Sequence, residues 1–373
     1  METIDSKHLA EIAGNFQISG RIGDIGKLAS GNIHDTYFVS TSRSEEKGFI
    51  LQKINRKVFP SPEKIIENHQ VLSEHLKGNR KAIDNSRLPW KIPQIVKTHT
   101  QDAFIVDRRG DFWRATEYIG NSKTYVCPSD PEIVYHVGRS LGQFHLLTST
   151  LDITRLHRVP DGFHVTSRYY KIFLSRQKTA KNRQDEEPFR FCLTVIQAMG
   201  AHVDILERAQ AENRLRIGTI HGDPKISNIL FHAQKKIPVG IVDLDTVQPG
   251  PVLYDIGDCA RSCCNPLGED TTDFDSVRFD LLLFQKLMEG YLEQVSAHFT
   301  RYDYRYLFDS LRLIAFELGL RFFTDYLSGD RYFGAAHRNH NLNRALVQFL
   351  LVRSMEKQKE TICGIVDRIR KRL

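Results

Sequence analysis

The chain has 373 residues, which at about 100–200 residues per domain indicates two domains or one bilobal unit. Hydrophobic residues make up 41% and charged residues 26% of the chain, so its composition excludes global disorder and collagen-like structure. Basic residues exceed acidic ones to give a net charge of +7. Because these charges are spread along the chain, we expect no nucleic-acid partner.

The first five residues are polar and acidic, which is not the pattern of a signal peptide. No apolar window approaches the length of about 18 residues that a membrane span requires, so we expect no membrane partner. The six cysteines form no Cys-x-x-Cys pair. We therefore expect reduced, mostly buried thiols in a cytoplasmic protein, without a zinc site.

Strand-type runs dominate the first 120 residues, and one helix interrupts them. In that helix Ser61 suits the N-cap and Pro62 the first helical position, and an apolar stripe follows. In the strand that contains Lys53, alternation places Phe49, Leu51 and Lys53 on one face. The predicted strands are Phe16–Ile18, Asp35–Val39, Phe49–Ile54, Ile92–Val96, Phe104–Val106 and Phe112–Ile119.

The pattern then becomes mainly helical. Amphipathic helices are predicted over Pro131–Leu147, from Phe189 to about Asn213, and from Phe274 to the end of the chain. Two short strands, Ile229–Phe231 and Val239–Val242, lie between these helical stretches. The fold class is therefore α+β, with a small β-rich domain over residues 1–119 and a larger, mainly helical domain over 120–373.

The segment His221–Asn228 carries the strongest chemical signal. Asp223 lies between a glycine and a proline, which places it in a rigid, non-helical loop. Asn228 follows five residues later, and Asp243 emerges at the end of a buried strand. Carboxylate and amide oxygens are the ligands that Mg²⁺ prefers, and the metal would hold nucleotide phosphates. Asp223 would then be free to orient or deprotonate a hydroxyl.

For the neighbouring polar residues we expect structural roles. His221 is expected to be a hydrogen-bonded structural histidine, and Asp245 a structural residue behind the metal ligands. Asp255 and Asp258 follow a Pro-Gly-Pro turn, so we interpret them as carboxylates stabilised at a helix N-terminus.

The His221–Asn228 segment resembles the catalytic loop of the aminoglycoside-phosphotransferase and choline-kinase group, which is related to the protein kinases. The wider chain resembles more narrowly the N-acetylhexosamine 1-kinase branch of that group. The segments that carry this second resemblance are Asp35–Tyr37, Leu51–Asn55, Phe112–Ala115, Asp243–Gly250, Tyr254–Asp258 and Leu320–Tyr326.

The resemblance implies a bilobal protein-kinase-like fold and a set of roles at the phosphate end of the site. Asp223 matches the catalytic base, Asn228 and Asp243 match the Mg²⁺ ligands, and Lys225 matches a lysine that contacts phosphate.

For the nucleotide, Lys53 falls near the strand lysine that holds the α and β phosphates, and Glu67 is its candidate partner. Two alternatives stay open, because Gln52 could occupy the equivalent point and Glu74 could replace Glu67. Tyr118 and Ile119 fall at the hinge, where the backbone would pair with adenine.

Four residues resemble positions that hold the sugar: Asn32, His34, Arg321 and Tyr332. In this chain the order of Asn32 and His34 is exchanged relative to the branch, which leaves their sugar contact open.

These features together predict an enzyme that uses ATP and Mg²⁺ to phosphorylate a small-molecule sugar, with the anomeric hydroxyl of an N-acetylhexosamine as the favoured acceptor. The oligomeric state is left open. The alternatives are another acceptor (an aminoglycoside, choline, homoserine or methylthioribose) and a nucleotide-binding pseudokinase. Many Arg and Tyr residues in the helical part argue against a cationic acceptor.

Overall fold

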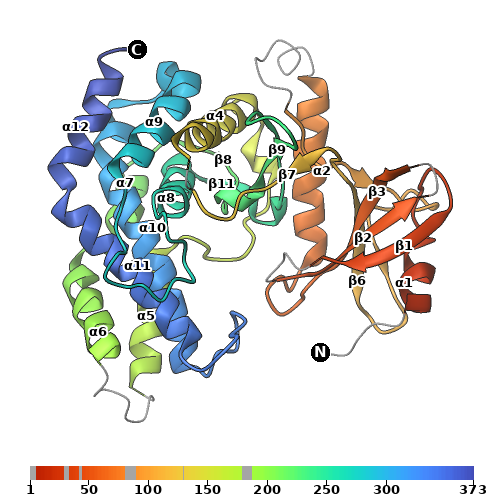
Figure 1. Ribbon diagram of the computed structural model, residues 1–373, viewed down its shortest axis with the longest axis horizontal. Helices are drawn as coiled ribbons and strands as arrows, with labels where there is room; N and C mark the ends of the chain where they lie inside the picture. Colours follow the sequence, from red (N-terminus) through yellow and green to blue (C-terminus); the bar gives the residue numbers. More distant parts are fainter. Residues whose placement is uncertain (1–5, 29–32, 42–43, 80–89, 129, 179–186) are drawn as a thin grey trace.

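A computed structural model shows a β-rich N-terminal lobe beside a larger, mainly helical C-terminal lobe (Figure 1). The α+β organisation predicted from the sequence is confirmed. The expected boundary at residues 119 and 120 falls between strands β6 and β7. The structure describes residues 6–28, 33–41, 44–79, 90–128, 130–178 and 187–373.

The N-terminal lobe is built on one antiparallel sheet with the order β1-β2-β3-β6-β4, and β5 also pairs with β6. In its centre, Lys53 of β3 lies opposite Asp35 of β2 and Trp113 of β6. The strands are β1 (Ile22–Lys27), β2 (Asp35–Thr41), β3 (Ser44–Lys53), β4 (Ile95–Val96), β5 (Ile105–Val106) and β6 (Phe112–Glu117).

The two faces of this sheet differ in chemistry. One face packs on helix α1 (Ser6–Ala13) and includes Leu51 and Trp113, both fully buried. Because side chains alternate along a strand, the next positions, Gln52 and Arg114, point to the opposite face. That polar face therefore carries the side chains that meet the C-terminal lobe.

Helix α2 (Pro62–Gly78) lies between the two lobes in Figure 1. Its buried residues recur at helical spacing, as the sequence predicts, and Pro62 occupies the first turn. Asn68 ties the helix to the larger lobe, because its amide donates to the carbonyls of His157 and Val247 at 2.8 and 2.9 Å.

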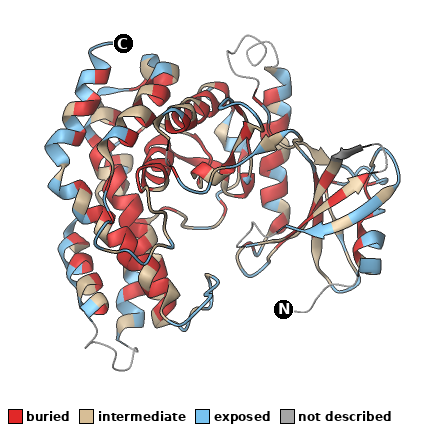
Figure 2. Ribbon diagram, in the orientation of Figure 1, coloured by how far each residue is buried: buried red, intermediate tan, exposed pale blue. Residues whose placement is uncertain are grey.

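The C-terminal lobe is a helical bundle around one large core. The longest helix runs through its middle and is mostly buried (Figure 2). The helices are α4 (Pro131–Leu147), α5 (Thr166–Gln177), α6 (Glu187–Met199), α7 (Ile205–Ala211), α8 (Val252–Cys263), α9 (Leu281–Val295), α10 (Arg301–Leu327), α11 (His340–Lys357) and α12 (Lys359–Arg370).

The C-terminal lobe also contains two small sheets, with the orders β10-β9-β7 and β11-β8. They frame the loop that contains Asp223, because this loop joins β8 to β9. The strands are β7 (Ser122–Lys123), β8 (Ile217–Ile220), β9 (Ile229–His232), β10 (Pro238–Ile241) and β11 (Gln248–Pro251).

Several predicted elements differ from the observed ones. The run Phe16–Ile18 is no strand, because only Phe16 makes an isolated bridge, to Thr98. The helix expected from Phe189 breaks at Gly200, where a 3-10 turn separates α6 from α7. By length and composition Glu187–Ala211 would suffice to cross a membrane, although the sequence indicated no such window. Its helix α6 packs on α11 in the helical lobe.

Candidate active site

The loop His221–Asn228 is held in an extended, turning path between β8 and β9. Gly222 has φ of 85°, and a Cβ atom there would lie 2.7 Å from the Thr246 carbonyl oxygen. Only glycine fits this approach without strain. His221 is fully buried, and its Nε2 lies 3.0 Å from the Val242 carbonyl, which agrees with the structural role expected for it.

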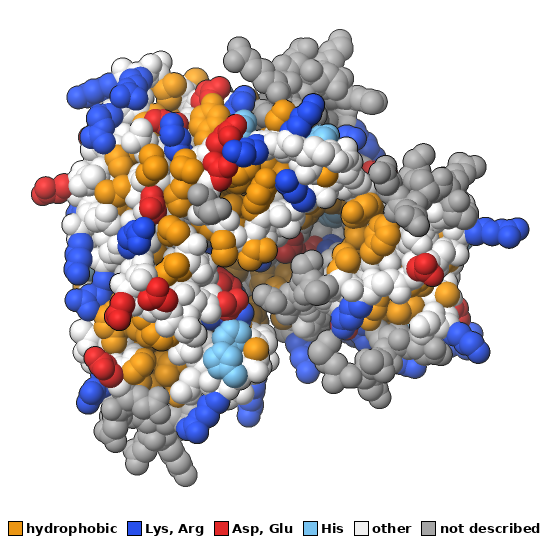
Figure 3. Space-filling model, viewed as in Figure 1, with side chains coloured by type: hydrophobic (Ala, Val, Ile, Leu, Met, Phe, Trp, Pro, Cys, Tyr) orange, Lys and Arg blue, Asp and Glu red, His pale blue; other side chains and the backbone are white. Residues whose placement is uncertain are grey.

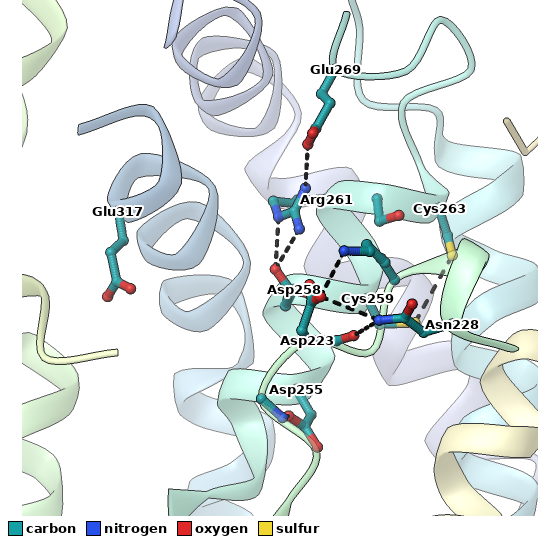
Figure 4. A network of polar contacts seen from close by, with 12 residues as sticks. Asp223, Asn228, Asp255, Asp258, Cys259, Arg261, Cys263, Glu269 and Glu317 are labelled. Carbon is teal, nitrogen blue, oxygen red and sulfur yellow. Dashed lines mark hydrogen bonds and ion pairs between the residues drawn. The ribbon is translucent and has the colours of Figure 1, made fainter. Parts of the chain in front are cut away.

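Asp223 is the centre of a short polar network (Figure 4). Lys225 Nζ lies 2.7 Å from Asp223 Oδ2, and Asn228 Nδ2 lies 3.2 Å from the same oxygen. Asn228 Nδ2 also donates to the Asp223 carbonyl at 2.8 Å. Burial pushes the pKa of Asp223 up, but the Lys225 ammonium, the Arg261 guanidinium and His221 together outweigh it, so the pKa lies below its usual value. Asp223 is therefore ionised at neutral pH and can accept a hydrogen bond.

Asp255, in the first turn of α8, holds the backbone of the His221–Asn228 loop in place. Its carboxylate accepts from the backbone N–H groups of His221 at 2.7 Å and Gly222 at 2.8 Å, and it lies 2.9 Å from His145 Nε2. These hydrogen bonds hold its pKa below the usual range despite complete burial. The sequence interpretation of Asp255 as a simple helix-terminal carboxylate missed this contact with the catalytic loop.

We expect the substitution Asp255→Asn to destabilise the protein by about 2–4 kcal/mol, because an amide cannot accept from all three donors and leaves buried groups unpaired. Urea denaturation measures this as a lower free energy of unfolding. The surface substitution Asp204→Asn, at a side chain 45% exposed, is the control. Equal stability of the two variants would contradict the bracing role.

Asp258 and Arg261, also on α8, form a second pair beside Asp223 (Figure 4). Arg261 Nε lies 2.7 Å from Asp258 Oδ1, and its Nη1 lies 3.4 Å from Glu269. Within the described chain Asp258 Oδ2 is buried without a hydrogen-bond partner. Asp258 thus stabilises the guanidinium rather than only a helix terminus.

Asp243 stands at the start of a 3-10 turn, Leu244–Thr246, with φ of 64° and ψ of 58°. Solvent reaches its side chain. The surrounding protein and the carboxylates of Asp245 and Asp223 raise its pKa above the usual value. Excess negative charge at this point would be stabilised by a cation.

The residues present fit a magnesium ion that other ligands complete. Asn228 uses its amide nitrogen on Asp223, which leaves Oδ1 as its free ligand atom. Across the described residues, no group of three His, Cys, Asp or Glu side chains is arranged to hold a metal. Mg²⁺ usually takes one or two protein carboxylates together with phosphates and water. Figure 3 shows a hollow between the lobes with acidic side chains visible in it.

The structure does not bring Lys53 to this cluster. Lys53 projects to the α1 side of the sheet, because it alternates with Gln52, and its Nζ lies 2.5 Å from Asp111. Glu67 is no partner for it either. Its carboxylate lies 2.6 Å from His157 Nε2, while the alternative, Glu74, lies 3.2 Å from Arg155.

Gln52, the alternative to Lys53, lies on the polar face. Its Oε1 accepts from Arg114 Nε at 3.0 Å and from Arg114 Nη2 at 2.8 Å. Tyr118 and Ile119 lie between β6 and β7, the segment that connects the lobes. Tyr118 is 39% exposed and contacts Phe38 with ring centroids 4.7 Å apart.

The residues expected at the sugar are dispersed. Asn32 lies outside the described residues. His34 is buried, and its Nε2 lies 2.6 Å from Asp245 while its Nδ1 accepts from the Asn55 backbone N–H. This places His34 in a structural contact rather than at an open surface.

Arg321, on α10, lies in a box of four aromatic rings: Phe163, Tyr169, Tyr332 and Phe333. Its guanidinium carbon is 5.1 Å from the centroid of Tyr169 and 5.8 Å from that of Tyr332. Over the described residues no ion pair joins it to a carboxylate. Tyr332 is 44% exposed, so this box opens to solvent on one side.

Sequence reasoning missed the connection between α10 and the catalytic loop. His164 Nε2 lies 2.9 Å from the Gly222 carbonyl, and its Nδ1 lies 3.2 Å from Glu317, one helical turn before Arg321. Phe163, adjacent to His164, is one wall of the aromatic box. His164 therefore connects the aromatic box to the loop that carries Asp223. Figure 4 shows Glu317 on a different helix from Asp255 and Asp258.

Comparison with known proteins agrees with this geometry. The chain is similar to a solved microcompartment-associated aminopropanol kinase, with a TM-score of 0.60 and 14% identity over 96% of this chain and 98% of that one. An amicoumacin kinase in complex with AMP-PNP and Ca²⁺ gives 0.59 and 14% over 95% and 94%. Choline kinase from Cryptosporidium parvum gives 0.56 and 14% over 98% and 99%.

These three likenesses confirm the expected kinase-like fold. Residues 24–279 match the family model described as the phosphotransferase enzyme family. This match spans more than half of the chain and contains the loop around Asp223 and the turn at Asp243, so the chain belongs to the phosphotransferase enzyme family.

Proposed function

We propose that this phosphotransferase is an ATP- and Mg²⁺-dependent kinase that phosphorylates a sugar hydroxyl, in particular the anomeric hydroxyl of an N-acetylhexosamine. The observation that carries the proposal is the arrangement around Asp223. An ionised carboxylate is held by Lys225 and Asn228, and Asp243 places a second carboxyl group at the turn that follows β10.

Each of these side chains has a chemical task in phosphoryl transfer. Asp223 would accept a hydrogen bond from the acceptor hydroxyl, align its oxygen and take its proton. Lys225 would contact the transferred phosphoryl group and balance its charge. Asn228 and Asp243 would hold Mg²⁺, which when bound neutralises charge on the nucleotide phosphates.

Arg321 supports a neutral acceptor. Within the described residues no carboxylate forms an ion pair with the Arg321 guanidinium, although Glu317 lies one helical turn away. Its positive charge disfavours a cationic acceptor, and its donors suit hydroxyl and carbonyl oxygens. The exposed ring of Tyr332 offers a flat surface for a sugar. An anomeric hydroxyl is also more acidic than an ordinary alcohol, so a carboxylate base would suffice.

Release of ADP over a panel of acceptors tests the proposal. We expect the wild-type protein with ATP and Mg²⁺ to respond most strongly to N-acetylglucosamine or N-acetylgalactosamine. A dominant response to choline or an aminoglycoside would overturn the sugar assignment but keep the kinase assignment. No ADP release with any acceptor would favour a pseudokinase.

The variant Arg321→Met keeps much of the packing in the aromatic box but removes the charge. We expect it to raise the KM for the sugar about 10- to 100-fold, since a hydrogen bond to a charged group contributes about 1.5–3 kcal/mol. The KM for ATP should stay close to that of the wild type. An unchanged sugar KM would show that Arg321 has only an internal role.

A further inference from the structure

Asp245 joins the two lobes through a buried cluster of polar side chains. Its Oδ1 lies 2.5 Å from Arg114 Nη1, and its Oδ2 lies 2.8 Å from Arg114 Nη2. His34 Nε2 lies 2.6 Å from Oδ2. The side chains of all three residues are at most 5% exposed. Asp245 belongs to the C-terminal lobe, while Arg114 and His34 belong to the N-terminal lobe.

Arg114 and His34, the two partners of Asp245, are each held by further hydrogen bonds. Gln52 accepts from the remaining edge of the Arg114 guanidinium, and its own amide donates to the Thr36 hydroxyl at 3.2 Å. His34 Nδ1 accepts from the Asn55 N–H at 3.0 Å, so its Nε2 carries the proton that faces Asp245. Three segments of the small lobe thereby join one polar network, in which Arg114 and His34 contact the Asp245 carboxylate.

The position of Asp245 in the chain connects this cluster to Asp243, the proposed metal ligand. Asp243 immediately precedes the 3-10 turn Leu244–Thr246, and Asp245 lies within that turn, two residues later. Residue Asn68 of α2 holds the end of the turn through the Val247 carbonyl. A shift of Arg114 would therefore move the backbone that presents Asp243 to the nucleotide.

Lys53 and Glu67 do not make this connection. Lys53 pairs with Asp111 in the small lobe, and both side chains are more than a quarter exposed. Glu67 pairs with His157, and these two side chains are 54% and 40% exposed. The pair between Arg114 and Asp245 is buried, and one hydrogen bond, from Nη2 to Oδ2 at 2.8 Å, joins the two groups; Nη1 and Oδ1 are in ion-pair contact without hydrogen-bond geometry. Because it is shielded from solvent, it is the stronger electrostatic contact.

From this juxtaposition we infer that Arg114 is a positioning residue. It anchors the sheet of the small lobe to the turn that carries Asp243, and so sets the place of the metal ligand relative to the nucleotide-covering strands. The buried ion pair that joins the lobes is therefore the one between Arg114 of β6 and Asp245 of this turn. Lys53 and Glu67, which the resemblance implies as an ion pair, do not contact each other. The inference rests on the proposed function, because it concerns binding of a magnesium nucleotide.

A paired substitution separates positioning from stability. Removal of Arg114 alone would leave the buried Asp245 carboxylate without its cationic partner, with only the hydrogen bond from His34, which destabilises the fold strongly. The double variant Arg114→Met with Asp245→Asn removes both charges and keeps an oxygen that accepts from His34. We expect its melting temperature to stay near that of the wild type.

Calorimetric titration with AMP-PNP and Mg²⁺ measures the effect without an acceptor. We expect the double variant to bind about 10- to 100-fold more weakly, the range found when groups that orient metal ligands are lost. Arg114→Lys, which keeps the charge but not the planar guanidinium that donates to both Gln52 and Asp245, should also bind more weakly, though by a smaller factor, and serves if the double variant fails to fold. Arg312→Met, which breaks a pair with Asp309 and Glu356 on the helical lobe, is the matched control.

The outcomes decide between the assignments. Nucleotide affinity within twofold of the wild type in a folded double variant, or in Arg114→Lys, would show that the pair is only structural. A larger loss in Lys53→Met than in the double variant would return the role to Lys53. Absence of nucleotide binding by the wild-type chain would contradict the proposed function itself and the inference with it.

Discussion

Replacement of Asp223 by asparagine should lower turnover about 100- to 10,000-fold, the range typical of a lost general base. The amide still offers one oxygen to Lys225 Nζ, which lies 2.7 Å from the carboxylate in the native protein, so the loop keeps its shape. What the variant loses is the negative charge that aligns the acceptor hydroxyl and takes its proton. ADP release under saturating sugar and ATP measures the change.

Nucleotide affinity separates this chemical loss from a folding defect. Because the proposed role of Asp223 is to act on the acceptor, we expect Asp223→Asn to bind AMP-PNP with Mg²⁺ nearly as tightly as the wild type. The control Asp204→Asn, on the surface near Arg208, should be active. Wild-type turnover in Asp223→Asn would refute the assignment of the base.

Replacement of Asp243 by asparagine is expected to cost at least about 100-fold in turnover, because a metal that neutralises phosphate charge contributes several kcal/mol to the transition state. Asparagine adopts the left-handed backbone conformation about as readily as aspartate does. The φ of 64° at this position is therefore tolerated, and the loss reports the charge rather than strain.

Raising the concentration of Mg²⁺ tests the cause. If Asp243 is a ligand, Asp243→Asn should need more Mg²⁺ for half-maximal turnover, whereas Asp223→Asn should not. The same Mg²⁺ requirement in Asp243→Asn and the wild type would count against coordination by this carboxylate.

Much of the fold follows from local sequence patterns. The helix that begins at Pro62 and the helix Pro131–Leu147 have both start signals and regular apolar stripes, and both form as predicted. Helix α1 was missed because its 8 residues are too few to be stable alone. Its formation depends on packing against the sheet, through Leu9 and Ile12. Its buried residues Leu9, Ile12 and Ala13 do stand at helical spacing, but a stripe of this length is too short to predict a helix by itself.

The candidate site also contains parts that the local sequence predicts and parts that depend on distant contacts. The segment from His221 to Asn228 is short, so its spacing alone indicates that Asp223 and Asn228 share a loop. The brace from Asp255 and the anchor between Arg114 and Asp245 depend on contacts across 34 and 131 positions of the chain, which one sequence does not report.

The Lys53 side chain points to a different face of the sheet from the one that the resemblance implies. Alternation predicts that it shares a face with Phe49 and Leu51, and both of these are buried in the core on the α1 side. The resemblance to the strand lysine points to the other face, where Gln52 and Arg114 lie. In this case the pleat of the strand was the better guide to the direction of the side chain.

The most direct test of the account is calorimetric titration of the wild-type protein with AMP-PNP, with and without Mg²⁺. We predict saturable binding that is much tighter when Mg²⁺ is present, and weakened by Asp243→Asn. Equal binding with and without the metal, or no binding in either case, would contradict the claim that Asp223, Asn228 and Asp243 converge on a magnesium nucleotide.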